Sequence, residues 1–266
     1  TVGVAHLETM GTQDNIAAEK GTLVERTSSD GPAVLNVDDE RVAAMAERAQ
    51  GPVWRVSTEG HPDADITAAN IEYDTSGTAF DVTDDTGTTV SFETELLGRH
   101  NVLNVLLAVA VGRSMGLRLR QMAHAARRLE PVEHRLQLRE QADVTIIDDA
   151  FNSNPVGARN AVEILSEMGE GRRIIVTPGM VELGDRQWDE NEALGTFIAQ
   201  HDLDLVVLVG DEQTAPIRQG LSAAQFPEER VTVVSSLSDA QNMLKQYLEP
   251  GDVVLYENDL PDQYSV

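Results

Sequence analysis

One segment in the middle of the chain runs Val144-Thr145-Ile146-Ile147-Asp148-Asp149-Ala150-Phe151-Asn152-Ser153-Asn154-Pro155. Its first residues are apolar and β-branched, which predicts a strand buried on both faces. Pro155 suits the first turn of a helix, which we expect to run to about Met168. Polar side chains therefore follow the carboxyl end of a parallel strand, where nucleotides bind in open α/β sheets. Asp, Asn and Ser are also ordinary turn residues, so this segment alone equally permits a simple capped turn.

After Pro131 the sequence alternates between strand and helix patterns. One further helix is expected from about Asp189 to Gln200, and apolar runs predict further strands at Arg173–Val176, Leu205–Val209, Val231–Val234 and Val253–Tyr256. Right-handed crossovers between such strands give a mainly parallel sheet with helices on both faces. We therefore predict an α/β fold, with a Rossmann-like carboxy-terminal domain over residues 132–266.

Residues 1–131 show a different pattern. Residues 66–97 alternate with period two and contain the turn signals Ser76-Gly77 and Thr86-Gly87, so we expect antiparallel hairpins there. Around them we expect a helix cap at Asp38-Asp39, strands at Ala33–Asn36 and Val53–Ser57, and helices at 12–26, 100–115 and 119–129. This part indicates a sheet that lacks its leading strands.

The composition excludes several classes of protein. The chain has 266 residues with 20 basic and 45 acidic side chains, a formal net charge of −25. Such a surface argues against nonspecific nucleic-acid binding, which depends on neutralising phosphates. The longest apolar runs, such as 102–111, are shorter than the roughly 20 residues that cross a bilayer, so we expect no membrane insertion. With no Cys, the chain fits a reducing compartment, and we expect a cytoplasmic protein.

Three spaced motifs occur in order along the chain. They are His6-Leu7-Glu8 followed by Lys20, then Gly98-Arg99-His100-Asn101-Val102-Leu103-Asn104, and then His134-Arg135 with the segment 148–155. Together they resemble the Mur ligase superfamily of ATP-dependent amide-forming enzymes. Segment 148–155, loop 177–184 and segment 257–262 are similar to the MurF branch, which joins D-alanyl-D-alanine to a UDP-N-acetylmuramoyl tripeptide in peptidoglycan precursor synthesis.

The resemblance implies that residues 1–131 are the second half of a P-loop-type central ATPase domain. The phosphate loop of that domain, G-x-x-G-K-[ST], occurs nowhere in the sequence. The Glu expected before His6 and the amino-terminal domain that grips the uridine nucleotide are not recognisable either. We therefore interpret the chain as part of a longer ligase, in which the missing amino-terminal part is its partner, and we expect it to be inactive by itself.

The resemblance also implies magnesium and two residues that meet it. His6 matches a metal ligand of the family, and Lys20, 14 residues later, matches a lysine that carries a carbamate. A carbamate is an oxygen anion, which suits a hard cation. Its formation needs the neutral amine, so burial or nearby cations must lower the pKa of Lys20. The alternative is a surface lysine in a helix, favoured by the dipole.

ATP is the nucleotide that the resemblance implies. Arg135 matches the arginine that contacts its terminal phosphate, for which a planar guanidinium is suited. The alternative for Arg135 is an ion pair with a carboxylate. The other positions of the family's nucleotide site are matched by Asn101, Asn104 and His134 at the adenine, Asp149 or, as second choice, Asp148 at the ribose hydroxyls, and Asn152 and Asn154 in the adjoining turn. For Asn101 and Asn104 the alternative is capping near Gly98.

Two other functions stay open from the sequence. The first is a ligase of the same superfamily for another carboxylate and amine, such as a folylpolyglutamate or poly-γ-glutamate synthetase. The second is a noncatalytic nucleotide-binding module, because the phosphate loop is absent. The MurF resemblance implies that the substrates are a nucleotide-sugar peptide and a dipeptide. Loop 177–184 follows a predicted strand, so we expect it at the same edge of the sheet as segment 148–155. Trp188 is interpreted as a packing anchor.

Overall fold

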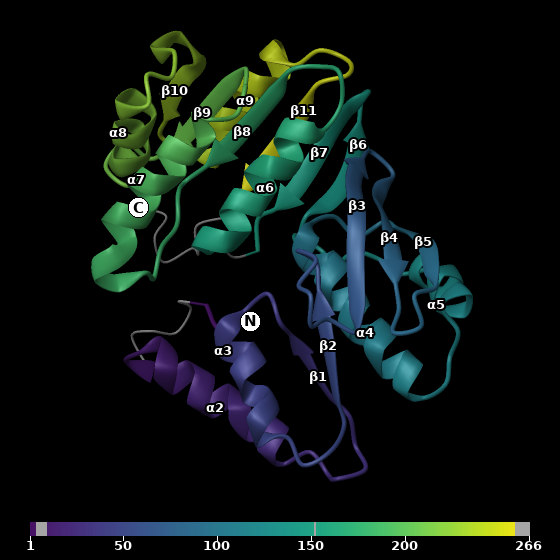
Figure 1. Cartoon of the computed structure of the whole chain (residues 1–266). Helices are drawn as coiled ribbons and strands as arrows, with labels where there is room; N and C mark the ends of the chain where they lie inside the picture. The colour runs from purple at the N-terminus through teal and green to yellow at the C-terminus, as the bar shows by residue number, and fades with distance from the viewer. Residues whose placement is uncertain (4–9, 152, 259–266) are drawn as a thin grey trace. The chain divides into compact units, whose positions relative to one another are not determined.

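The computed structural model describes residues 1–3, 10–151 and 153–258. These residues form a mixed α/β fold with two sheets, which confirms the predicted fold class. The chain divides into two compact units (Figure 1). The first holds the residues up to Glu72 together with Ser76–Glu130, and the second holds Tyr73–Thr75 and the chain from Pro131 onward. His6 and Asn152 lie outside the described residues, as does most of segment 257–262.

The first unit contains, within the described residues, a sheet in the order β1-β2-β3-β4-β5. Its strands are β1 (Ala33–Asn36), β2 (Val53–Ser57), β3 (Ile66–Asp74), β4 (Gly77–Thr83) and β5 (Thr89–Thr94). Its helices are α2 (Gln13–Glu25), α3 (Glu40–Ala43), the 3₁₀ helix η1 (Ala44–Arg48), α4 (Arg99–Ser114) and α5 (Leu119–Ala126). Val102, Leu106 and Val109 of α4 are buried in one core with Phe80 and Phe92 of the sheet. That packing fixes the amino end of α4, where Asn101 and Asn104 lie.

The antiparallel pairing predicted within residues 66–97 is confirmed for β4 and β5, which pair from Thr78↔Thr94 to Thr83↔Thr89. β3 lies beside β4 in the sheet. On its other side β3 pairs parallel with β2, a strand outside this segment, at Val56↔Ile66. The period-two pattern indicates a strand but not its direction, because side chains alternate in both kinds of pairing. The predicted cap is Asp39, which accepts hydrogen bonds from the Arg41 and Val42 N–H groups.

The second unit contains a sheet in the order β10-β9-β8-β11-β7-β6. Its strands are β6 (Gln137–Gln141), β7 (Val144–Asp149), β8 (Arg173–Thr177), β9 (Leu205–Val209), β10 (Val231–Val234) and β11 (Val253–Glu257). Its helices are α6 (Pro155–Glu167), α7 (Gln187–Ile198), α8 (Ala215–Ala223) and α9 (Leu237–Tyr247), with 3₁₀ turns η2 (Gly184–Arg186) and η3 (Glu228–Arg230). β7 to β11 pair parallel, as predicted. Figure 1 shows α6 and α9 on opposite faces of this sheet.

Alternation along the strands divides the second core into two layers. Ala240 and Leu244 of α9 pack against Val207, Val209 and Val254. The intervening residues of the same strands, such as Leu208 and Leu255, are fully buried but belong to the opposite face. Successive residues at a strand end therefore enter different environments.

Two features of this unit differ from the sequence prediction. β6 is an antiparallel edge strand that pairs Gln141↔Val144 through a two-residue turn, and its polar sequence gave no strand signal. Ala142 and Asp143 both have positive φ, 53° and 63°, although hairpin turns of this kind favour Asn-Gly or Asp-Gly. Trp188 is 49% exposed at the start of α7, so the prediction of a packing anchor is wrong. Among the described helices, none combines the length and the apolar character that crossing a bilayer requires.

Candidate functional site

The candidate site of the second unit is made where segment 134–136 meets segment 148–151. The Phe151 N–H donates to the His134 carbonyl at 3.1 Å, and the Leu136 N–H donates to Asp149 Oδ1 at 3.1 Å. His134 Nδ1 lies 3.0 Å from Asp148 Oδ2. The Arg135 guanidinium covers the Phe151 ring, with Cζ 4.4 Å from the ring centroid. The structure thus brings together four of the predicted nucleotide-site residues, His134, Arg135, Asp148 and Asp149.

Backbone conformation at this junction is unusual. His134 has φ 59° and Leu136 has φ 47°, a region that residues other than Gly rarely adopt. Leu136 is only 2% exposed, so its apolar side chain anchors the segment while its N–H is directed to Asp149. Strained residues held by surrounding contacts concentrate at functional sites. Segment 134–136 is therefore held in a conformation that depends on its contacts with segment 148–151.

Asp148 and Asp149 face opposite sides of the sheet. Asp148 is paired with Tyr256 in register and Asp149 with Glu257, so each aspartate shares a face with a different neighbour. Asp148 is 8% exposed; it lies within hydrogen-bond distance of His134 Nδ1 and forms an ion pair with Arg139 Nη2 at 3.1 Å. Because two side chains already contact Asp148, Asp149 is the aspartate with fewer side-chain partners.

Burial raises the pKa of Asp149 from 3.8 to about 7, and the charge of Glu257 adds to this effect. The Leu136 N–H and the Arg135 charge act in the opposite direction. Glu257 is fully buried, and burial raises the pKa of its carboxyl group as well. The site therefore holds two neighbouring carboxyl groups that resist ionising together.

Asp149→Asn is expected to change how stability depends on pH. The pKa of Asp149 is about 7 in the folded protein and 3.8 in the unfolded chain. At a pH between these two values, Asp149 keeps its proton in the folded state and has released it in the unfolded state. The free energy of unfolding therefore falls as pH rises through this window and levels off above about 7. Asp149→Asn should remove this loss, on the order of 1–4 kcal/mol between pH 4 and pH 8.

Urea unfolding of the wild type, of Asp149→Asn and of the exposed-site control Asp63→Asn at pH 4, 6 and 8 measures this difference. The control should follow the wild type. An Asp149→Asn profile parallel to that of the wild type over the whole range would show that Asp149 titrates normally.

Glu257 also connects three loops at the carboxyl edge of the sheet. It accepts hydrogen bonds from Ser153 Oγ, ahead of α6, and from Thr177 Oγ1 at 2.5 Å, at the end of β8. Thr177 Oγ1 in turn accepts from the Gly179 N–H at 2.9 Å. Asn258 donates its side-chain amide to the Gly179 carbonyl at 2.7 Å and its N–H to the Asp149 carbonyl. Loop 177–184 is thereby anchored to the same edge as the aspartates.

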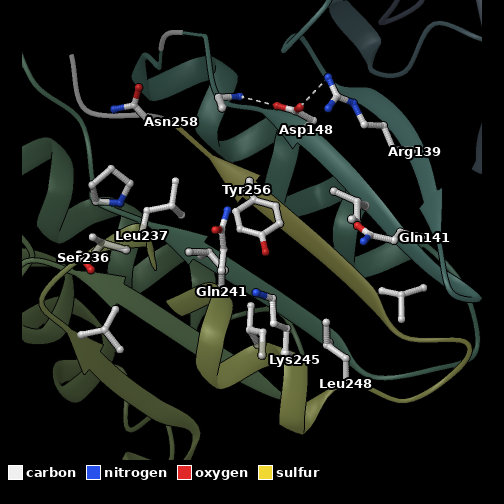
Figure 2. A pocket seen from close by; sticks show the side chains of 18 of the residues that line it. Arg139, Gln141, Asp148, Ser236, Leu237, Gln241, Lys245, Leu248, Tyr256 and Asn258 are labelled. Atoms are coloured by element: carbon white, nitrogen blue, oxygen red, sulfur yellow. Dashed lines mark hydrogen bonds and ion pairs between the residues drawn. The ribbon is translucent and has the colours of Figure 1, made fainter. Parts of the chain in front are cut away.

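An open groove of about 2010 Å³ borders these residues on the α9 face of the second unit. Figure 2 shows Asp148 and Arg139 at one end of the groove, with Tyr256 between them and α9. His134 and Phe151 line the same groove. Asp149 is not among the lining residues, in agreement with its position on the other face.

Asn154 has the capping role that the sequence left open. Its side chain accepts from the Val156 and Gly157 N–H groups, at 3.2 and 3.0 Å, and begins α6. It shapes the turn, as predicted, and its carboxamide oxygen is engaged by the helix.

In the first unit, Asn101 and Asn104 form one connected pair. Asn101 Nδ2 donates to the Leu97 carbonyl at 2.8 Å, and Asn104 Nδ2 donates to Asn101 Oδ1 at 3.1 Å. Asn104 is exposed, while Asn101 is half-buried. The pair therefore combines a local structural contact with an exposed amide that a ligand can reach.

Family models match both units. The model described as "Mur ligase middle domain" matches residues 1–112. The model described as "Mur ligase, glutamate ligase domain" matches residues 134–256. The chain belongs to the Mur ligase family.

Relatives of this chain include proteins named as UDP-N-acetylmuramoyl-tripeptide--D-alanyl-D-alanine ligases and one named as a UDP-N-acetylmuramate--L-alanine ligase. The chain is 30% identical to the UDP-N-acetylmuramoyl-tripeptide--D-alanyl-D-alanine ligase of Mycobacterium leprae, over 96% of this chain and 54% of that protein. Crystal structures of MurF from Acinetobacter baumannii and of MurF from Thermotoga maritima in complex with ADP each match with a TM-score of 0.82, at 24% and 22% identity. They are covered over 56% and 57% of their length, and this chain over 99% and 97%. The chain thus spans about half the length of the relatives it matches.

Of the two predicted metal residues of this Mur ligase, only Lys20 lies within the described residues, and its side chain is exposed on α2. The described residues include no group of three or more His, Asp or Glu side chains placed to hold a metal ion. The predicted magnesium site stays a prediction.

Sequence reasoning assigned no role to Glu257, Ser153, Thr177, Phe151 or Arg139. For Glu257 a signal was present, because Val253, Leu255 and Glu257 alternate along one strand and so share a buried face. Arg139 had no signal, since the β6 hairpin that carries it was not predicted.

Proposed function

We propose that this chain provides the second half of the central domain and the carboxy-terminal domain of a ligase that forms an amide at the expense of ATP. The proposed substrates are a UDP-N-acetylmuramoyl tripeptide and D-alanyl-D-alanine, the reaction named for the M. leprae relative. The observation that carries this proposal is the joining of segments 134–136 and 148–151, which gathers His134, Arg135 and both aspartates at one sheet edge.

The proposed reaction has two steps. A carboxylate oxygen of the tripeptide attacks the terminal phosphorus of ATP, and ADP leaves, which produces an acyl phosphate. The amine of the dipeptide then attacks the acyl carbon, inorganic phosphate leaves, and the amine loses a proton as the amide forms. Phosphoryl transfer of this kind depends mostly on positioning and charge neutralisation.

Each cluster has a proposed part in these steps. Arg135 would neutralise charge on the transferred phosphoryl group, because a guanidinium can donate two parallel hydrogen bonds to phosphate oxygens. Asp149 would accept hydrogen bonds from the ribose hydroxyls, and Asn101, Asn104 and His134 would hold the adenine. Magnesium and a carbamate on Lys20 remain proposals that rest on the family resemblance, and so does the metal ligand His6.

Phosphate release by the complete ligase tests the proposed function. The protein encoded by the whole gene should release phosphate from ATP only when UDP-N-acetylmuramoyl tripeptide and D-alanyl-D-alanine are both present. The 266-residue chain is the matched control, and it should release none, because its sequence contains no phosphate loop to cradle the phosphates.

The same assay separates the alternatives. Release with a folate or a polyglutamate acceptor and glutamate would assign the protein to another branch of the superfamily. Nucleotide binding without release under any substrate pair would indicate a noncatalytic module. We further propose a cytoplasmic location, which fits the absence of Cys and a soluble nucleotide-sugar substrate.

A further inference from the structure

Arg135 and Phe151 form a cation–π pair at the exposed rim of the candidate site. The guanidinium carbon lies 4.4 Å from the ring centroid. Phe151 is 62% exposed, and Arg135 is exposed as well. Among the ion pairs that the described residues form, none involves Arg135, whereas the neighbouring Arg139 is paired with Asp148. In a chain of net charge −25, this arginine is held by an aromatic ring in place of a carboxylate.

The backbone brings the two side chains together. The Phe151 N–H donates to the His134 carbonyl, one residue before Arg135, and the Leu136 N–H donates to Asp149, two residues before Phe151. These hydrogen bonds hold the chain on both sides of the pair. The cation–π contact is therefore supported by the backbone at the junction of the two segments and does not depend on the side chains alone.

The contact with the ring also leaves the guanidinium available to an anion. The ring attracts the cation without neutralising its charge, so the N–H groups of the guanidinium can still donate to an anion. An ion pair with a carboxylate would occupy those same N–H groups. A long arginine side chain that is already oriented loses less conformational freedom when it binds phosphate.

We propose that Phe151 is a positioning residue, which holds the Arg135 guanidinium in the orientation that meets the phosphoryl group transferred from ATP. The inference rests on the proposed function for its consequence, but the contact itself is a property of this chain. The two can therefore be tested apart.

Nuclear magnetic resonance of the 266-residue chain tests the contact. The side-chain protons of Arg135 should show the upfield shift produced by the ring, and Phe151→Leu should abolish that shift while Phe151→Tyr preserves it. Because Phe151 is exposed, Phe151→Leu should leave the unfolding temperature unchanged. Arg135 resonances that are identical in the wild type and in Phe151→Leu would overturn the proposal.

Kinetics of the complete ligase test the consequence. Phe151→Leu should lower kcat about 2- to 5-fold with little change in the KM for ATP, and Phe151→Tyr should restore kcat, in line with the strength of an exposed cation–π contact. In an Arg135→Ala background, Phe151→Leu should have no further effect. If the two substitutions lower kcat by the product of their separate factors, Phe151 acts independently of Arg135.

Arg172 and Tyr247 provide a matched control. Their guanidinium carbon and ring centroid are also 4.4 Å apart, and neither residue belongs to the candidate site. Tyr247→Leu should leave kcat unchanged. A complete ligase that releases no phosphate with any substrate would contradict the proposed function, while the resonance measurement would still decide the positioning role of Phe151.

Discussion

Lys20→Ala in the complete ligase is expected to abolish nearly all phosphate release. If Lys20 carries a carbamate, the substitution removes an oxygen anion, and Lys20→Arg keeps a positive charge but cannot supply that anion, so it should fail too. Short carboxylic acids added to Lys20→Ala should restore part of the activity, because their oxygens can replace those of the carbamate. Phosphate release at saturating substrates, with and without acetate, measures both effects.

An exposed basic residue at the end of the same helix serves as the control. Arg26 follows the last residue of α2, and Arg26→Ala should leave phosphate release unchanged. An active Lys20→Arg ligase would show that Lys20 is not a carbamate. Exposure of Lys20 on α2 makes this result informative, since the described residues do not bury its amine.

Arg135→Ala and Asn104→Ala are expected to affect different kinetic constants. Arg135 is proposed to meet charge that shifts during phosphoryl transfer, so its loss should appear mainly in kcat. Asn104 is proposed to contact a base that does not change, so its loss should appear mainly in the KM for ATP. Each loss should be about 1–3 kcal/mol, or roughly 5- to 150-fold.

Initial rates at varied ATP concentration separate the two effects. If both variants change the same constant, or if Asn104→Ala leaves the KM for ATP unaltered, these residues do not meet opposite ends of the nucleotide. Asn101→Ala is not equivalent to Asn104→Ala, because Asn101 also holds the Leu97 carbonyl at the start of α4. A lower free energy of unfolding in Asn101→Ala, but not in Asn104→Ala, would confirm that Asn101 also stabilises the start of α4.

Most elements could be predicted because their signals are local. The apolar run Leu205–Val209 is buried at every position of β9, and Pro155 follows the Asn154 cap of α6. β6 could not be predicted, since Gln137–Gln141 is polar and half-exposed at a sheet edge, where little burial shapes the sequence. Trp188 was misjudged for a related reason: its residue type favours burial, but its place in the first turn of α7 faces outward.

The candidate site was predictable as a set of motifs and not as a set of contacts. His134 and Asp148 were both predicted as nucleotide-site residues. Their contact, however, depends on positive φ angles at His134 and Leu136, which neither residue type favours. Asp149 and Asp148 are adjacent and chemically alike, but Asp148 contacts His134 and Arg139, whereas Asp149 is buried near Glu257, which raises the pKa of Asp149 to about 7. The pleat of β7 places the two side chains on opposite faces of the sheet, and the neighbours on each face determine the burial and charge that each carboxylate meets.

The sequence by itself determined the α/β class, the parallel strands from β7 to β11 and the family motifs, because helix and strand periodicity and residue identity are local properties. Tertiary structure alone decided which residues meet. Ser153 and Glu257 are 104 positions apart, and they touch because the crossover through α9 inserts β11 between β7 and β8. That insertion buries Glu257 beside Asp149, raises the pKa values of both carboxyl groups and joins the loops of the site. No local pattern specifies strand order, since it depends on how the whole sheet buries its two faces.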